Sequence, residues 1–200
     1  MLNPTEIPYL CPMNTIHAAA RSFLFLLGSA RPEGNTEQLA RRAAAALPAE
    51  VSQQWLSLLD LPLPPFVDIR HSVGVYPAPQ GPEKTLAEAT LAATDIVFAT
   101  PLYWYSVSAS TKLYLDYWSG WMRVPELDFR ARMAGKTAWV ISANSDEAGA
   151  KMSEALILTL KLSADYMQMQ WGGTLLGYAN RPGDILQDER ALTAAADFFR

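Results

Sequence analysis

One stretch near the start of the chain constrains the fold more than any other. Residues 23–27 read FLFLL, residues 28–36 read GSARPEGNT, and residues 37–47, EQLARRAAAAL, carry apolar residues at helical spacing. A short apolar run followed by a glycine-containing loop and a helix is typical of a buried parallel strand in an α/β protein. The first turn of such a helix offers unpaired N–H groups and a partial positive charge to the loop. The stretch therefore predicts a site for an anion such as a phosphate.

The spacing within the loop narrows the kind of phosphate. A nucleotide-triphosphate loop requires G-x-x-x-x-G-K-[ST], but Gly28 and Gly34 are one residue too far apart and Asn35 stands in the lysine position. The dinucleotide fingerprint G-x-G-x-x-G is also absent. The loop instead favours a terminal phosphomonoester that is held and not transferred. The residues expected to contact this phosphate are Ser29, Arg31, Gly34, Asn35 and Thr36. The alternative is an ordinary strand-to-helix turn in which Asn35 or Thr36 is the N-cap.

A second segment, residues 99–118, reads ATPLYWYSVSASTKLYLDYW. It is similar to the flavin-ring loop and following helix, TPxYWxSxSAxxKxxxD, of the NAD(P)H-dependent FMN reductases, a branch of the flavodoxin-like superfamily. The first loop, GSARPEGNT, resembles the GSxRxxGNT loop of the same family. The two motifs occur in the family's order, and the resemblance covers residues 22 to about 180. It implies FMN as cofactor, NADPH or NADH as electron donor, and a homodimer.

The flavin ring needs apolar walls and backbone donors at its polar edge. A loop that leaves a strand can supply both, and the candidates are Pro101, Leu102, Tyr103, Trp104 and Tyr105. A third contact is expected from Ala143, Asn144 and Ser145, although this chain has SANSDEAG where the family often has a glycine-rich loop. The alternative for the three consecutive aromatic residues is a role in the core or at an interface.

The pattern of apolar and polar segments predicts the rest of the fold. Strands are expected at 22–28, 51–59, 96–100, 137–142 and 171–178, and helices at 35–47, 83–93, 109–120, 150–165 and 187–199. This alternation predicts a three-layer α/β fold with a parallel sheet and helices on both faces. The flavodoxin-like order 2-1-3-4-5 fits the count and puts the ligand crevice at the carboxyl ends of the first and third strands. The proline-rich segment 60–82 is expected to be a functional or mobile loop, or a surface excursion.

Aromatic residues are unusually frequent in and just after the helix expected at 109–120. Core packing explains some of these four residues, Tyr114, Tyr117, Trp118 and Trp121. Homodimer interfaces concentrate aromatic side chains, so an interface explains the excess better.

Composition excludes several classes of partner. The net charge is −4 without a basic block, which argues against nucleic acid and anionic membranes as partners. The single cysteine, Cys11, cannot form an internal disulfide, and the isolated His17 and His71 do not suggest a metal site. Residues 1–21 lack a basic n-region and a continuous apolar core, so we expect an N-terminal extension and not a secretory signal, with residues 22–200 as one domain. No run of 18 apolar residues occurs, and a cytoplasmic location is expected.

The crevice motifs contain no histidine, cysteine or paired carboxylates, so no catalytic side chain is expected and the flavin carries the chemistry. The favoured function is an FMN-dependent oxidoreductase that passes electrons from a nicotinamide to a flavin, quinone or similar small acceptor by a ping-pong mechanism. One alternative is a flavodoxin-like electron carrier that never meets a nicotinamide. Another is a flavin-binding regulatory or interaction protein. The sequence does not separate NADH from NADPH or name the acceptor.

Overall fold

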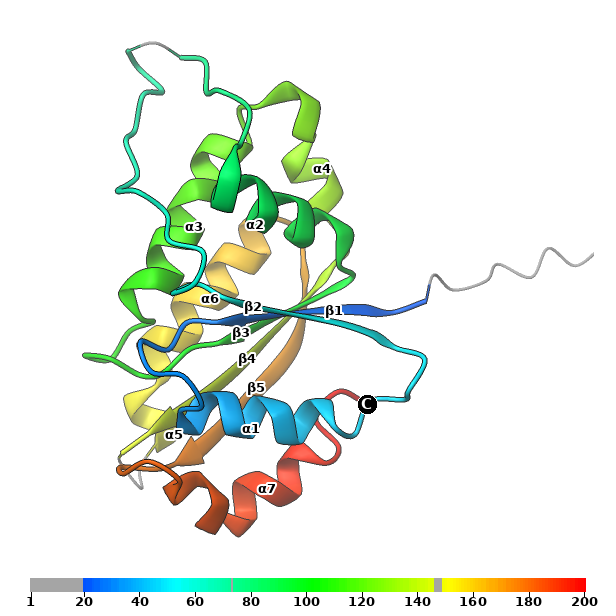
Figure 1. The fold of residues 1–200 in the computed structure, drawn as a ribbon, viewed down its shortest axis with the longest axis vertical. Coiled ribbons are helices and arrows are strands. Elements are labelled where there is room, and N and C mark those ends of the chain that lie inside the picture. The colour runs from blue at the N-terminus through cyan, green and yellow to red at the C-terminus, as the bar shows by residue number, and fades with distance from the viewer. Residues whose placement is uncertain (1–19, 73, 146–148) are drawn as a thin grey trace, which may run out of the picture.

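The computed structural model describes residues 20–72, 74–145 and 149–200. The expected extension 1–21 lies almost wholly outside these ranges, as do Cys11 and His17. The centre of the fold is a five-stranded parallel sheet in the order β2-β1-β3-β4-β5 (Figure 1). Its strands are β1 (Ser22–Leu27), β2 (Ser52–Ser57), β3 (Asp95–Ala99), β4 (Thr137–Asn144) and β5 (Gln170–Tyr178). The predicted fold class and strand order are confirmed.

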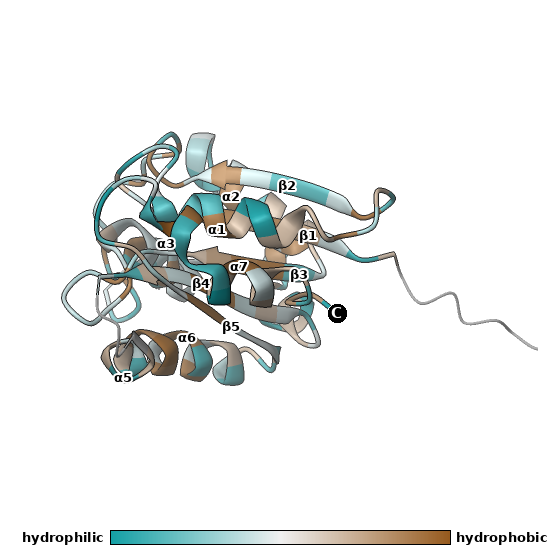
Figure 2. Cartoon of the chain, turned by 90° about the horizontal axis from the view of Figure 1, so that it is seen from below, coloured by the Kyte–Doolittle hydropathy of each residue, from teal (hydrophilic) through white to brown (hydrophobic). Residues whose placement is uncertain are grey.

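Helices cover both faces of the sheet. On one face lie α1 (Asn35–Ala44) and α7 (Glu189–Ala195), and on the other lie α2 (Gly81–Ala92), α3 (Ala109–Trp121) and α6 (Glu154–Tyr166). Alternate residues of β1 point to opposite faces, with Phe23 and Phe25 in the core under α1 and Leu24 and Leu26 in the core under α2 and α3. Figure 2 shows hydrophobic strands in the middle of the sheet and a more hydrophilic β2 at its edge. The central strands are thus continuous apolar runs because both of their faces are buried.

The aromatic residues of α3 are core residues. Tyr114 and Trp121 are fully buried, and Tyr117 and Trp118 are 8% and 5% exposed. They pack on Phe98 of β3 and on one another. Burial raises the pKa of the Tyr114 hydroxyl, whose partner is Thr90 at 2.7 Å. The inference of an interface from these four side chains is therefore wrong, because the core of the protomer itself accounts for all of them.

Part of that core comes from the segment 121–135, between α3 and β4. It contains a short 3₁₀ turn, η1 (Pro125–Leu127), and a short helix, α4 (Phe129–Met133). Phe129 and Met133 are buried, and the Phe129 ring packs against Trp118 and Trp121. The segment 121–135 thus covers the aromatic cluster of α3.

The proline-rich segment 60–82 is an irregular excursion until α2 begins at Gly81, and it packs on α3 at the top of Figure 1. Phe66 stacks with Tyr76 and meets the ring of Tyr117 edge-on. The Tyr117 hydroxyl donates to the carbonyl of Pro64 (3.0 Å). Burial and the nearby Glu83 carboxylate raise the pKa of Tyr117. The segment is a packed surface excursion, as one of the two expectations had it.

Two other helices differ from the predicted boundaries. The expected helix 150–165 is divided at Ser153 into α5 (Gly149–Met152) and α6. The expected helix 187–199 is only α7, preceded by a 3₁₀ turn, η2 (Asp184–Gln187).

The first of the two glycines near the start of β5 lies where a side chain would not fit. A Cβ atom on Gly172 would lie 2.4 Å from the ring of Trp139, where the β4–β5 register shifts.

The edge of the sheet at the amino ends of the strands is held by a buried carboxylate. Asp95 accepts hydrogen bonds from Arg21 (2.6 Å) and from the indole N–H of Trp139 (2.9 Å). Arg21 also donates to the carbonyl of Phe199 (2.9 Å), which ties the segment after α7 to the residue that precedes β1. This cluster lies at the edge opposite the carboxyl ends of the strands, so it stabilises the fold away from the predicted crevice.

Candidate functional site

The loop after β1 folds over the beginning of α1. Its N-cap is Gly34, with extended backbone and no side-chain cap, so neither Asn35 nor Thr36 is the N-cap. The first bond of the helix runs from the N–H of Gln38 to the carbonyl of Gly34 (3.0 Å). The N–H groups of residues 35–37 therefore have no intrahelical acceptor and point towards the loop. Together with the helix dipole they form an anion site.

The loop itself is compact. The N–H of Arg31 donates to Oγ of Ser29 (3.1 Å), and Glu33 has the left-handed backbone angle φ 52°. A Cβ atom on Gly34 would lie 3.2 Å from Oγ of Ser29 and 3.3 Å from the carbonyl of Arg31. A side chain at position 34 would therefore press on the loop where it closes over the helix.

Side chains of α1 connect the loop to two other strand ends. Oγ1 of Thr36 accepts a hydrogen bond from the N–H of Ala143 in β4 (3.2 Å), which leaves its hydroxyl proton free to donate to a ligand. The Asn35 side chain bonds the backbone after β5, donating to the carbonyl of Arg181 and accepting from the N–H of Gly183. The start of α1 is thus fixed against β4 and β5.

A hydroxyl network joins the loops after β1 and β3. Oγ1 of Thr100 accepts from the N–H of Ser108 (3.0 Å), and Oγ of Ser110 donates to the carbonyl of Gly28 (3.1 Å). Oγ of Ser108 accepts from the N–H of Thr111 and caps α3. These bonds fix the spacing between the predicted phosphate loop and the predicted ring loop.

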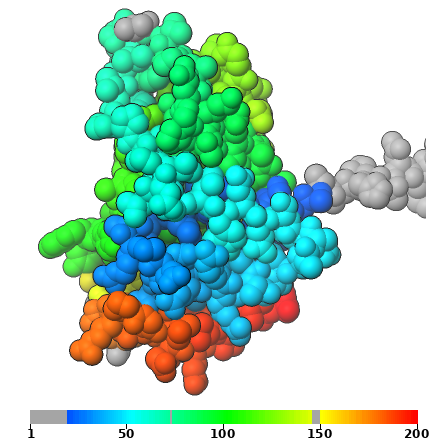
Figure 3. All heavy atoms as spheres, in the orientation of Figure 1, coloured from blue at the N-terminus to red at the C-terminus, as the bar shows by residue number. Residues whose placement is uncertain are grey.

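The loop after β3 contains a tight aromatic turn. Tyr103 and Ser106 exchange two backbone hydrogen bonds of 3.0 and 3.1 Å across Trp104 and Tyr105. Both turn residues have left-handed backbone, with φ of 50° and 62°. Their side chains are 94% and 52% exposed, and in Figure 3 the green segment with this turn projects from the left of the molecule. The structure therefore does not put Trp104 and Tyr105 in the cavity wall.

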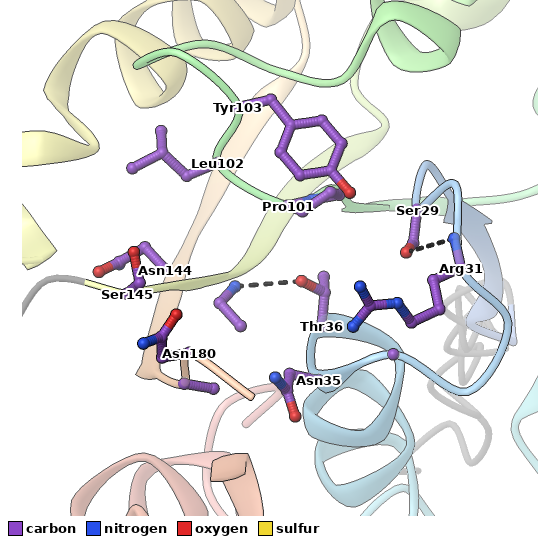
Figure 4. Close-up of a pocket in the computed structure, with 13 residues that line it drawn as sticks. Ser29, Arg31, Asn35, Thr36, Pro101, Leu102, Tyr103, Asn144, Ser145 and Asn180 are labelled. Atoms are coloured by element: carbon purple, nitrogen blue, oxygen red, sulfur yellow. Dashed lines mark hydrogen bonds between the residues drawn. The ribbon is translucent and has the colours of Figure 1, made fainter. Parts of the chain in front are cut away.

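All of these loops meet around a cavity of about 310 Å³ at the carboxyl ends of β1, β3, β4 and β5 (Figure 4). Every predicted site residue except Trp104 and Tyr105 lines it: Ser29, Arg31, Gly34, Asn35, Thr36, Pro101, Leu102, Tyr103, Ala143, Asn144 and Ser145. Ala143 and Asn144 belong to β4, which is longer than predicted. Residues that are 114 positions apart in sequence, such as Ser29 and Ala143, share one wall because the strands are parallel.

Two lining residues, Ala179 and Asn180, were not predicted. They follow β5, and the N–H of Ala179 donates to the carbonyl of Asn144 (2.7 Å). The predicted pairing of the fifth strand with the fourth was a signal for them, because neighbouring parallel strands end at the same edge.

The electrostatics of the cavity suit an anion at one end and an apolar ring at the other. Arg31 and the start of α1 lie at one end, and Pro101, Leu102 and Tyr103 at the other (Figure 4). Among the described residues that line the cavity, none is acidic, and none is a histidine or cysteine. The described part of the chain has no cluster of three or more His, Cys, Asp or Glu side chains that could hold a metal. It also has no helix that is long and apolar enough to cross a membrane.

Comparisons with known proteins agree with this geometry. Residues 22–175 match the model of the NADPH-dependent FMN reductase family. A Bacillus subtilis protein that bears the name NAD(P)H-dependent FMN-containing oxidoreductase YwqN is 36% identical over 174 residues, 86% of this chain and 93% of its own.

Solved structures share the fold. The Trp repressor binding protein from Bacillus subtilis is 30% identical with a TM-score of 0.70, over 89% of this chain and 97% of its own. A WrbA-like flavodoxin from Agrobacterium tumefaciens is 16% identical with a TM-score of 0.54, over 90% of this chain and 95% of its own, and shows likeness of fold alone. The chain belongs to the NADPH-dependent FMN reductase family and is an oxidoreductase with FMN as cofactor and NAD(P)H as electron donor.

Proposed function

We propose that the cavity holds FMN with its phosphate at the start of α1 and its ring between the loops after β3 and β4. The observation that carries this proposal is the polarity of the cavity, with Ser29, Arg31 and Thr36 at one end and Pro101 and Leu102 at the other. When bound, FMN takes a hydride from NAD(P)H and passes two electrons to an acceptor. The chain binds and orients the reactants.

The donor set fits a phosphomonoester. Two hydroxyls, one guanidinium and the free N–H groups of the first helical turn converge on it, and charge-assisted hydrogen bonds of this kind are the strong ones. On the ring side, Ala143, Asn144 and Ser145 can meet one edge of the flavin and Tyr103 can meet its other side.

Size supports a ping-pong mechanism. About 310 Å³ is near the lower end of small-molecule sites, which span about 300–1,000 Å³. The cavity therefore has room for one small molecule, the flavin. The nicotinamide and the acceptor then bind one after the other at the mouth of the cavity. The exposed rings of Trp104 and Tyr105 directly follow Tyr103, which lines the cavity, and they favour a planar acceptor, such as a free flavin or a quinone.

We also propose a homodimer, held by exposed side chains of α6 and the neighbouring face of α3 and not by the buried aromatic residues of α3. Leu158, Leu162 and Tyr166 form a stripe on α6, and their side chains are 55%, 57% and 56% exposed. Next to them, Leu115 and Met122 of the α3 region line a groove with Leu162 and Tyr166. Exposed apolar patches of this kind mark protein–protein contacts.

The proposed location of the protein is the cytoplasm, because NAD(P)H is the electron donor.

The test is the absorption spectrum of the purified protein, followed by addition of NADPH or NADH without oxygen. We expect a bound-flavin spectrum that bleaches with at least one nicotinamide and returns when a quinone is added. A flavin spectrum that neither nicotinamide bleaches would support the electron-carrier alternative. Absence of flavin binding would remove the proposal.

A further inference from the structure

The Asn35 side chain joins two parts of the site that are far apart in sequence. Its Nδ2 donates to the carbonyl of Arg181 (2.9 Å), and its Oδ1 accepts from the N–H of Gly183 (2.9 Å). The amide thus meets one backbone acceptor and one backbone donor at the same time. Such a paired arrangement fixes the orientation of the amide and the position of the backbone that it bonds.

The segment that Asn35 holds forms a wall of the cavity. Ala179 and Asn180 line the cavity, and Figure 4 shows Asn35 and Asn180 on the side opposite Tyr103. The segment turns at Gly183, which has φ 86°, and the N–H groups of Asn180 and Arg181 donate to the Asp184 carboxylate at 3.2 and 2.6 Å. It contains no helix or strand of its own between β5 and η2, so its position depends on these few bonds.

We propose that Asn35 is a positioning residue: its side chain pins the segment 179–183 and thereby sets Asn180 as a wall of the FMN cavity. Contact with the phosphate is left to the backbone N–H groups of the first helical turn and to the side chains of Ser29, Arg31 and Thr36. The inference rests on the proposed placement of FMN for its functional part. Its structural part concerns the protein without ligand.

The first experiment is amide hydrogen exchange on the flavin-free protein. In Asn35→Ala the N–H of Gly183 loses its acceptor, and we expect it to exchange about three- to tenfold faster, the effect of one hydrogen bond. The matched control is Gln38→Ala, since Gln38 also lies in the first turns of α1 and donates to a backbone carbonyl, that of Glu33 (2.7 Å). Gly183 should exchange at the parent rate in this control. Unchanged exchange in Asn35→Ala would overturn the proposal whether or not the protein binds FMN.

The second experiment is a double-mutant cycle on FMN affinity. Asn35→Ala and Asn180→Ala are each expected to raise the FMN Kd about fivefold, and the double variant only about as much as either alone, because both remove the same wall. If the two effects multiply instead, Asn35 acts on FMN independently of Asn180 and the proposal fails.

A third variant tests the same segment from its other side and leaves α1 intact. Asp184→Ala removes the acceptor of the Asn180 and Arg181 N–H groups and should also raise the FMN Kd several-fold. A parent-like Kd in Asp184→Ala would mean that the position of the segment does not matter for FMN. If the parent protein does not bind FMN, the proposed function is contradicted. The exchange experiment still tests the role of Asn35 in that case, because it uses the flavin-free protein.

Discussion

The Oγ1 atom of Thr111 occupies the space that a side chain on Gly28 would need. A Cβ atom built on Gly28 would lie 2.1 Å from Thr111 Oγ1 and 2.9 Å from Ser108 Oγ. Gly28 follows the end of β1 and Thr111 lies in the first turn of α3, so the phosphate loop and the ring loop meet at this point. The glycine is required here by space and not by an unusual backbone angle.

Gly28→Ala is therefore expected to lower the free energy of unfolding by about 1–3 kcal/mol, the usual effect of overpacking. Urea unfolding measures this change. Thr111→Ala in the same chain removes the nearest clashing atom and should recover part of the loss. Strictly additive losses in the double variant would show that the close approach is not the cause.

The hydroxyls of the phosphate loop should contribute directly to FMN affinity. Ser29→Ala and Thr36→Val each remove one hydrogen bond to a charged group, worth about 1.5–3 kcal/mol, so the FMN Kd should rise about tenfold or more. Flavin fluorescence quenching measures the Kd. Ser72→Ala, in the excursion away from the cavity, is the control and should bind FMN like the parent. Parent-like binding by both loop variants would remove Ser29 and Thr36 from the phosphate site.

The proposed dimer surface is tested with a single charge. Leu162→Glu in the α6 stripe should convert a dimer into a monomer at micromolar protein, because an unpaired carboxylate would be buried in the interface. Light scattering gives the mass. The control is Leu186→Glu, since Leu186 is equally exposed (57%) but lies in η2 on the other side of the sheet. A monomeric parent protein would contradict the dimer itself.

The aromatic turn should affect substrate choice and not the ability to react. We expect substitutions of Tyr103, Trp104, Tyr105 or Asn144 to alter FMN affinity, flavin potential or acceptor preference while NAD(P)H still reduces the bound flavin. Stopped-flow bleaching of FMN-loaded variants measures this. A slowing of more than about a thousandfold in one variant with FMN still bound would identify an acid or base, whose contribution is typically 10²–10⁴.

Asp188 should make stability depend on acid pH. Burial raises the pKa of its carboxyl, but hydrogen bonds from the N–H groups of Tyr178 and Ala191 outweigh burial and hold the pKa below its ordinary value of 3.8. Because the folded-state pKa is lowered, this stabilisation is complete above pH 3.8 and is lost as the pH falls through the lowered value.

The corresponding variant is Asp188→Ala, which removes the cap of α7 and should cost about 1 kcal/mol at neutral pH. Urea unfolding at pH 7 and near pH 3 should show a smaller difference between the two pH values in this variant than in the parent. Asp197→Ala is the control, because Asp197 is exposed near the end of the chain. An equal pH dependence in parent and Asp188→Ala would contradict the assignment.

The sequence predicted well which residues lie together where strands end, and predicted less well how chain segments cover one another. Apolar runs locate the strands, and parallel strands bring their carboxyl ends to one edge, so Ser29, Pro101 and Asn144 were predicted to lie close together. Asn180 was not predicted because the segment after β5 carries no motif, and only the place of the fifth strand in the sheet pointed to it.

Two misreadings have physical causes. The turn from Tyr103 to Ser106 directs the side chains of Trp104 and Tyr105 outward. No local sequence pattern predicts left-handed backbone at a tryptophan and a tyrosine. The α3 aromatics seemed too many for one core because the segments that cover them, 60–82 and 121–135, look like plain loops in sequence. Phe129 and Phe66 supply that cover.

In the turn from Tyr103 to Ser106, the residues that would stabilise the fold differ from the residues that give an exposed aromatic surface. Two-residue turns with this backbone favour Asn-Gly, and each non-glycine residue in the left-handed region costs about 1–2 kcal/mol. Trp104→Asn together with Tyr105→Gly should therefore raise the melting temperature while it removes both exposed rings. An engineer seeking a thermostable scaffold and one seeking a broad acceptor range would choose opposite residues at these two positions.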